Sequence, residues 1–174
     1  MIARASLLVA ASIFLLFAGP SSAQDDPASV ERIARAYLAA YESADVPRLA
    51  ELAAEDIEFR DDSAPADPAG GPYHFVGREA WLAGLQGFIA DGGLIDMHQS
   101  HDLAYQSGSQ MVFVGRVDAR YRAPSQGVLH FKTRIVTVLT VREGRVWRHI
   151  DIADYSGAQT EVVRDESPDR PLPL

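Results

Sequence analysis

The stretch AYLAAYESADVPRLAELAAEDIEF, residues 36–59, contains the change of pattern that decides the fold. Up to Tyr41 it continues a series of apolar residues at helical spacing. The Asp-Val-Pro sequence that begins at Asp45 then starts a second, short helix. After this helix Ile57 and Phe59 alternate with charged residues, which is the period of a half-buried strand. The stretch therefore predicts two helices that lead directly into a strand.

The chain on either side of this stretch completes an α+β pattern. A Pro- and Gly-rich loop, residues 62–76, follows the strand and has a length that often covers a site. A third helix is predicted around Trp81 and ends at the Gly pair 92–93. Four β-rich runs separated by short turns come next: 94–105, 111–122, 128–142 and 145–155. Consecutive hairpins of this kind predict a curved antiparallel sheet that the three helices close on one side.

The first 23 residues have the composition of a signal peptide. Arg4 supplies a positive start, and the apolar run from Leu7 to Ala18 is too short to span a bilayer. Small residues ending at Ala23 form a cleavage site, so we expect the mature chain to begin at Gln24. The chain contains no cysteine, which leaves neither a lipid attachment point nor a disulfide framework. A periplasmic or secreted protein without a membrane anchor is predicted.

The rest of the chain has the size of one domain and a negative charge. We assign residues 24–156 to this domain and 157–174, with three prolines and several charges, to a flexible tail. The whole chain carries 16 Lys and Arg against 24 Asp and Glu. Such a surface repels phosphate backbones and anionic lipid, so nucleic acid is not an expected partner.

The sequence lacks the motifs of metal, nucleotide and nucleophile chemistry. His98 and His101 suggest a metal pair, but three positions apart on a strand they point to opposite faces. No Gly-rich phosphate loop, nucleophile elbow or catalytic cysteine is present. We therefore expect neither a metal nor another cofactor.

Three segments carry a resemblance to a known superfamily. They are residues 36–59, the VGREAW start of the third helix and the closing REGRVWRHIDIADY, residues 142–155. Together with the order of elements, they resemble the nuclear transport factor 2-like superfamily, which includes SnoaL-like cyclases, ketosteroid isomerases and limonene-1,2-epoxide hydrolases. The resemblance covers essentially the whole mature chain. It implies a cone-shaped curved antiparallel sheet whose helices enclose an apolar pocket, a small hydrophobic ligand and a homodimer.

The epoxide hydrolases supply the first hypothesis about function. Their Arg-x-Asp pair and the third acid on the last strand match Arg116, Asp118 and Asp151. The mechanism that the resemblance implies has Asp151 taking a proton from water, Asp118 donating one to the epoxide oxygen and Arg116 holding both. The water-positioning Tyr and Asn of those enzymes are matched by Phe59 and Asp61, so that part of the pattern is missing.

The isomerases supply a second hypothesis, and a binding protein without chemistry is a third. Tyr37 and Asp61 match an oxyanion donor and a base, whereas the second oxyanion acid falls near Thr137, which cannot replace it. On pattern alone, Tyr37 also fits a core aromatic, and Asp61 also fits a strand-end residue that caps the following loop. The third possibility is a pocket protein that binds a hydrophobic metabolite.

The orientation of two strands separates these hypotheses. Along residues 111–122, alternation places Arg116 and Asp118 opposite the apolar face, as a solvated ion-pair ladder, whereas the resemblance places them in the pocket. Both orientations remain open from the sequence. Asp151 shares the parity that faces the cavity in isomerase-like relatives. We expect Phe59, Trp81 and His149 to contribute to substrate binding.

Overall fold

A computed structural model describes residues 26–64, 72–91, 93–123 and 127–163. The predicted signal peptide, residues 1–23, lies outside them and stays a prediction. No helix among the described residues is both long and apolar enough to cross a membrane.

Three helices form where the sequence predicts them. They are α1 (Pro27–Glu42), α2 (Val46–Leu52) and α3 (Arg78–Asp91). Proline in the first turn starts α1, and the Asp45 side chain caps α2 by accepting a hydrogen bond from the Arg48 amide at 3.0 Å. The apolar stripe of α1, which includes Tyr37 and Leu38, is fully buried against the sheet.

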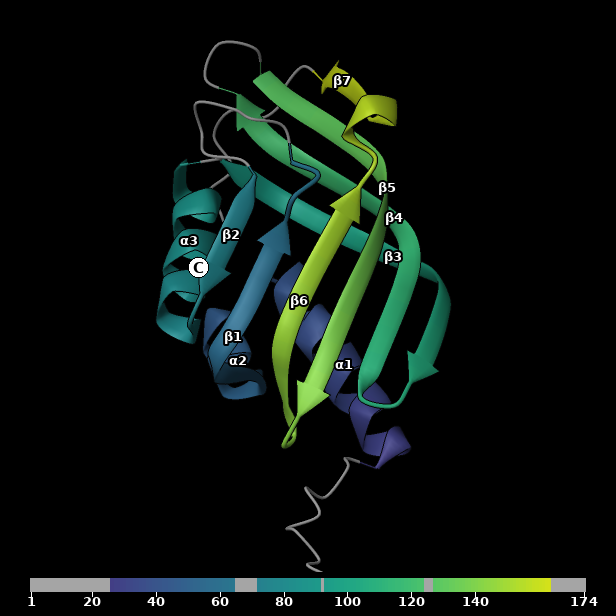
Figure 1. Cartoon of the computed structure of the whole chain (residues 1–174). Helices are drawn as coiled ribbons and strands as arrows, with labels where there is room; N and C mark the ends of the chain where they lie inside the picture. The colour runs from purple at the N-terminus through teal and green to yellow at the C-terminus, as the bar shows by residue number, and fades with distance from the viewer. Residues whose placement is uncertain (1–25, 65–71, 92, 124–126, 164–174) are drawn as a thin grey trace, which may run out of the picture.

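Seven strands form one curved sheet that stays open (Figure 1). In chain order they are β1 (Ala53–Asp61), β2 (Tyr73–Val76), β3 (Leu94–Ser107), β4 (Gln110–Ala123), β5 (Gly127–Arg142), β6 (Arg145–Ala153) and β7 (Gln159–Val163). The order in space is β2-β1-β6-β5-β4-β3, and β7 pairs with β5. The predicted α+β class is confirmed, although β1 runs parallel to β6, so the sheet is mixed and not purely antiparallel.

Two segments differ from the sequence prediction. Tyr73–Val76, predicted as the end of a loop, form β2 and pair antiparallel with β1. Gln159–Val163, predicted as part of the flexible tail, form β7 instead. The reason is that β5 extends beyond the end of β6, and its first half, Val128–Lys132, offers a free edge that β7 covers.

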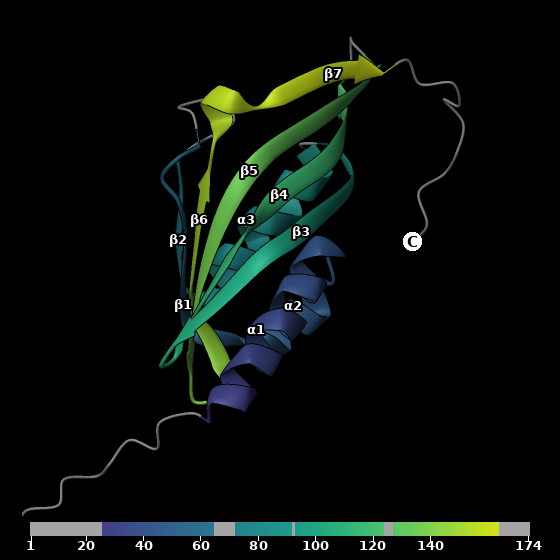
Figure 2. The same cartoon turned by 90° about the vertical axis from the view of Figure 1, so that its right-hand side faces the viewer.

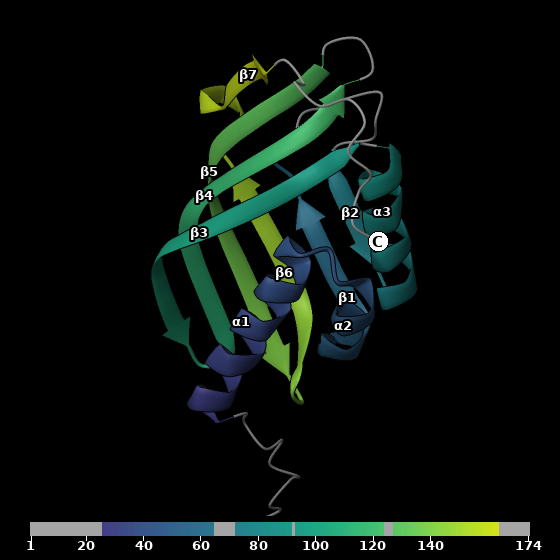
Figure 3. The same ribbon diagram turned by 180° about the vertical axis from the view of Figure 1, so that it is seen from behind.

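The helices lie on the concave side of the sheet, as Figures 2 and 3 show from the side and from behind. The largest core cluster lies between the helices and the sheet and includes Leu49, Ile57 and Leu139. Strands β3 and β4 approach closely at Gly115, where a β-carbon would lie 1.7 Å from the Ser100 carbonyl oxygen. This contact explains why glycine is needed there.

Candidate active site

The concave face and the helices enclose a cavity of about 290 Å³. Its walls are mostly aromatic and aliphatic. The lining residues are Tyr41, Phe59, Asp61, Tyr73, Phe75, Trp81, Gly84, Leu85, Phe88, Met97, Gln99, Val117, Tyr121, Phe131, Thr133, Ile135, Asp151, Ala153 and Tyr155. Two carboxylates, and no Lys, Arg or His side chain, are found among these described residues. A small apolar molecule with a polar end fits such a lining.

Asp151 on β6 is the less restrained of the two carboxylates. The residue is 4% exposed, and its Oδ1 atom accepts a hydrogen bond of 2.5 Å from the Thr137 hydroxyl. Gln99 on β3 in turn donates to Thr137 Oγ1 at 3.0 Å. Within the described residues, this is the one hydrogen bond that the Asp151 carboxylate receives. Its second oxygen is therefore available to a ligand in the cavity.

His149 and Tyr37 lie behind Asp151, and neither lines the cavity. His149 Nε2 is 3.1 Å from Asp151 Oδ1, although the angle is outside the range of a hydrogen bond. Its Nδ1 atom is 3.2 Å from the Tyr37 hydroxyl. Burial raises the pKa of Tyr37 far above its usual value, so the phenol stays neutral. The predicted roles of Tyr37 as an oxyanion donor and of His149 as a substrate contact are therefore not supported by their positions.

Aromatic rings surround the His149 imidazole on several sides. The rings of Tyr37, Tyr41, Phe59 and Trp81 all meet it nearly at right angles, with centroids 4.8 to 6.2 Å away. Phe59 and Trp81 also stack on each other at 4.1 Å. Both of these predicted binding residues line the cavity. This packing fixes the plane of the imidazole ring.

Asp61 ends β1 and is held by four hydrogen bonds. Its Oδ1 accepts from the Ser63 amide at 3.1 Å, from the Ser63 hydroxyl at 2.5 Å and from the Ala64 amide at 3.0 Å. Its Oδ2 accepts from the Tyr155 hydroxyl at 2.7 Å. Burial and this bond to a carboxylate raise the pKa of Tyr155. Asp61 is thus a loop cap, one of the two roles that the pattern allows.

The parallel pairing of β1 and β6 brings the two carboxylates together. Asp61 and Asp151 are partners in the β1–β6 register, and both line the cavity. Neighbouring strands lie roughly 4.8 Å apart, so two side chains on the same face of this register are close neighbours.

Arg116 and Asp118 lie on the convex face, away from this pair. Val117 between them lines the cavity, so strand alternation directs its two neighbours outward. Asp118 pairs with His130 at 2.5 Å and with Lys132 at 3.5 Å. The His130 hydrogen bond lowers the pKa of Asp118. The structure therefore does not bring Arg116 and Asp118 to Asp151, as the epoxide-hydrolase arrangement requires.

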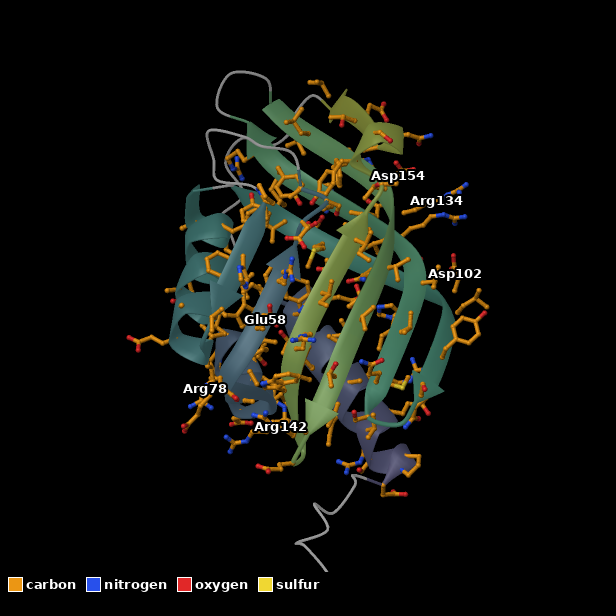
Figure 4. The ribbon with its side chains drawn as sticks, in the orientation of Figure 1. Glu58, Arg78, Asp102, Arg134, Arg142 and Asp154 are labelled. Carbon is orange, nitrogen blue, oxygen red and sulfur yellow. The ribbon has the colours of Figure 1, made fainter. Side chains whose placement is uncertain are left out.

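The surroundings of Arg116 confirm its outward position. It lines a surface depression together with Asp102, Arg134 and Asp154. Figure 4 shows the Arg134 and Asp154 side chains near the end of β6 and the Asp102 side chain farther down, at the β3 edge of the sheet. No group of three or more His, Asp or Glu side chains that could hold a metal ion occurs in the described ranges.

Two site features were missed in the sequence analysis. Gln99 and Thr137 form a buried polar pair beside Asp151, and Tyr155 holds Asp61. A signal for the first was present, because Gln99 and Thr137 are polar residues inside β-rich runs. Tyr155 gave none, since its hydroxyl reaches Asp61 across 94 positions of sequence.

The chain is similar to proteins of known fold over most of its length. The SnoaL-like domain profile matches residues 34–149, more than half of the chain. A putative SnoaL-like polyketide cyclase from Shewanella denitrificans is 19% identical, with a TM-score of 0.64, over 75% of this chain and 93% of that one. An epoxide hydrolase from Mycobacterium tuberculosis, described as LEH-like, is 14% identical with a TM-score of 0.59, over 75% and 86% of the two chains.

A protein from Catenulispora acidiphila with a ketosteroid isomerase-like fold, solved with trimethylamine, is 20% identical with a TM-score of 0.55, over 68% and 82% of the chains. Comparison with curated proteins finds no significant match. At these identities the solved structures establish the fold and leave the reaction open. The profile match establishes the family: the chain belongs to the SnoaL-like domain family within the nuclear transport factor 2-like superfamily.

Proposed function

We propose that this protein is an acid/base enzyme of the cyclase or isomerase type. In this proposal Asp151 removes a proton from a carbon atom next to the carbonyl group of a small hydrophobic substrate. One observation carries the proposal: Asp151 is 4% exposed, lines an apolar cavity and has only Oδ1 bonded within the described protein. A buried carboxylate with a free oxygen is suited to accept a proton from a bound molecule.

The two carboxylates have different roles in this proposal. Asp61 accepts four hydrogen bonds, which hold it in place. Asp151 receives one, so it can take up a proton with little loss of hydrogen bonding. Asp151, and not Asp61 as in the isomerase hypothesis, is therefore the proposed base.

Neutral phenols are the proposed partners of the oxygen anion that forms on the substrate. Tyr41 and Tyr121 line the cavity. Burial raises the pKa of Tyr121 to about 12 and that of Tyr41 well above its usual value, so both remain donors at neutral pH. Hydrogen bonds from neutral donors in an apolar cavity stabilise a developing enolate.

The test is the exchange of substrate hydrogen with solvent. A panel of cyclic ketones, enones and aromatic methyl ketones is incubated with the protein in D₂O, and deuterium uptake is followed by NMR. We expect exchange at the carbon next to the carbonyl, and a loss of about 10²–10⁴-fold in Asp151→Asn. Ligand binding to the wild type and to Asp151→Asn, measured by tryptophan fluorescence, should be retained.

Asp118→Asn is the matched control, because it removes an acid from the convex face. It should leave the exchange rate unchanged. Equal damage by both variants would favour the epoxide-hydrolase arrangement over the one proposed here. Binding without exchange for every panel member would favour the pocket protein without chemistry.

We also propose export and self-association. The composition of residues 1–23 supports export to the periplasm or the medium. Exposed apolar side chains on the convex face, among them Leu103, Tyr105 and Ile152, support a homodimer. Sedimentation of the purified protein tests the second point, and a monomer at micromolar concentration would contradict it.

A further inference from the structure

A buried row of three polar groups crosses the core from α1 to the cavity. The Tyr37 hydroxyl is 3.2 Å from His149 Nδ1, and His149 Nε2 is 3.1 Å from Asp151 Oδ1. Tyr37 and His149 have no exposed surface at all. Since neither lines the cavity, they cannot touch a substrate, and their chemistry can act only through Asp151.

We infer that Tyr37 is a positioning residue whose hydroxyl keeps His149 Nδ1 unprotonated, so that His149 presents its Nε2 proton to the Asp151 carboxylate. This inference rests on the proposed role of Asp151 as the base. It assigns to His149 one tautomer, with the proton on Nε2.

The number of protons and acceptors on Tyr37 and His149 supports this tautomer. Because Tyr37 is neutral, its hydroxyl carries one proton that needs an acceptor inside the core. Among the described residues, His149 Nδ1 is the atom to which this hydroxyl is bonded. The indole of nearby Trp81 has only a donor, so it cannot take that proton. A neutral imidazole that accepts at Nδ1 carries its own proton at Nε2.

The opposite assignments leave the Tyr37 phenol proton without an acceptor or bring two acceptors together. If Nδ1 carried a proton, it would donate to the phenol oxygen of Tyr37, and the phenol proton would then have no acceptor among the described residues. A buried donor without a partner costs about 1–3 kcal/mol. In the neutral form with the proton on Nδ1, Nε2 would also place a lone pair against the Asp151 carboxylate, where two acceptors repel.

The tautomer matters because Asp151 Oδ1 is then flanked by two donors. Thr137 donates to this oxygen at 2.5 Å, and the Nε2 proton lies close to the same atom. The second contact is poorly aligned without a ligand, and catalytic hydrogen bonds often tighten only when substrate binds. The Thr137 bond and the nearby Nε2 proton both lie at Oδ1, which leaves the other oxygen for the cavity.

The surrounding aromatic rings fix the position of the His149 ring, whereas its tautomer depends on the Tyr37 hydroxyl. They hold the plane of the imidazole, and a phenyl ring in place of Tyr37 would keep the same packing. Tyr37→Phe therefore removes the proton donor while the ring stays in place. Tyr41→Phe is the matched control, because the Tyr41 ring also packs on His149, at 5.1 Å, whereas no hydrogen bond joins its hydroxyl to the imidazole.

The experiment reads the tautomer directly in protein labelled with ¹⁵N histidine. His149→Gln identifies the His149 signals by their loss. In the wild type we expect an unprotonated Nδ1 and a protonated Nε2 at neutral pH; a protonated Nδ1 would overturn the inference without any variant. In Tyr37→Phe we expect a shift toward the Nδ1-protonated tautomer, and in Tyr41→Phe no shift. An unchanged tautomer in Tyr37→Phe would also overturn the inference.

Exchange kinetics supply the functional half of the test. With a panel member that exchanges, kcat of Tyr37→Phe should fall about 10- to 100-fold while KM changes less than about threefold, as for other residues that orient a reacting group. A changed tautomer with unchanged kcat would overturn the positioning role. The NMR measurement needs no substrate, so failure of the proposed reaction and failure of this inference give different results.

Discussion

Removal of the Asp61 carboxylate is expected to destabilise the protein strongly. Asp61→Ala takes away the acceptor of four hydrogen bonds, two of them from the Ser63 and Ala64 amides. A buried donor left without a partner costs about 1–3 kcal/mol, which applies in full to the buried Ala64 amide and in part to the half-buried Ser63 amide. The Tyr155 hydroxyl can turn toward the cavity, which limits the free-energy cost of losing its hydrogen bond to Asp61. We expect a loss of about 3–5 kcal/mol, a large part of the stability of a typical domain.

Urea unfolding followed by tryptophan fluorescence measures this loss. Asp62→Ala is the control, because the adjacent Asp62 side chain is exposed and, within the described residues, pairs with exposed Arg60 alone. Such a surface pair contributes about 0–1 kcal/mol. The midpoint of Asp61→Ala should fall without a change in the slope of the transition. A stability within about 1 kcal/mol of the wild type would refute the role of Asp61 as a cap.

Three further outcomes are expected. Gly115→Ala should lower the free energy of unfolding by at least about 3 kcal/mol, because the new β-carbon would meet a main-chain carbonyl of β3. Gly87→Ala, whose β-carbon would have no atom within 4 Å, should stabilise α3 by about 0.5–1 kcal/mol. Equal melting temperatures of the two variants would contradict this. The His130 hydrogen bond lowers the pKa of Asp118, so this pair stabilises the fold above the unfolded carboxyl pKa of about 3.9 and ceases to do so as the pH falls through the lower folded pKa. The small difference in stability between the wild type and Asp118→Asn should therefore vanish in strong acid. A difference that grows in strong acid would be inconsistent with the pair. N-terminal sequencing of exported protein should begin at Gln24, and an intact start recovered from the cytoplasm would contradict the signal peptide.

The sequence predicted which segments form helices and strands better than it predicted which strands lie side by side. Period and turn residues located the helices and the four long strands, because these signals are local. The parallel contact between β1 and β6 has no local signal, since its register joins residues such as Phe59 and His149 that lie 90 positions apart. Strand β7 was missed for a related reason. It pairs with the part of β5 that extends beyond the end of β6, and this difference in length appears only in the folded sheet.

The site was predictable to the extent that strand parity determined it. Asp151, Asp61, Phe59 and Trp81 line the cavity as expected. For Arg116, alternation gave the outward direction that the structure has, and the superfamily resemblance pointed the other way. The direction of a hydroxyl such as that of Tyr37 depends on which acceptor the core provides, and no sequence pattern describes that choice.

The pairing of β1 with β6 also has a consequence for synthesis. Asp61 is made early and Asp151 ninety residues later, so the two carboxylates can meet only after nearly all of the domain has been translated. Closing so large a loop carries an entropic cost that only contacts formed late can repay. A partly synthesised chain therefore has no cavity in which the proposed substrate could bind. Truncation before β6 should abolish binding altogether and not merely weaken it.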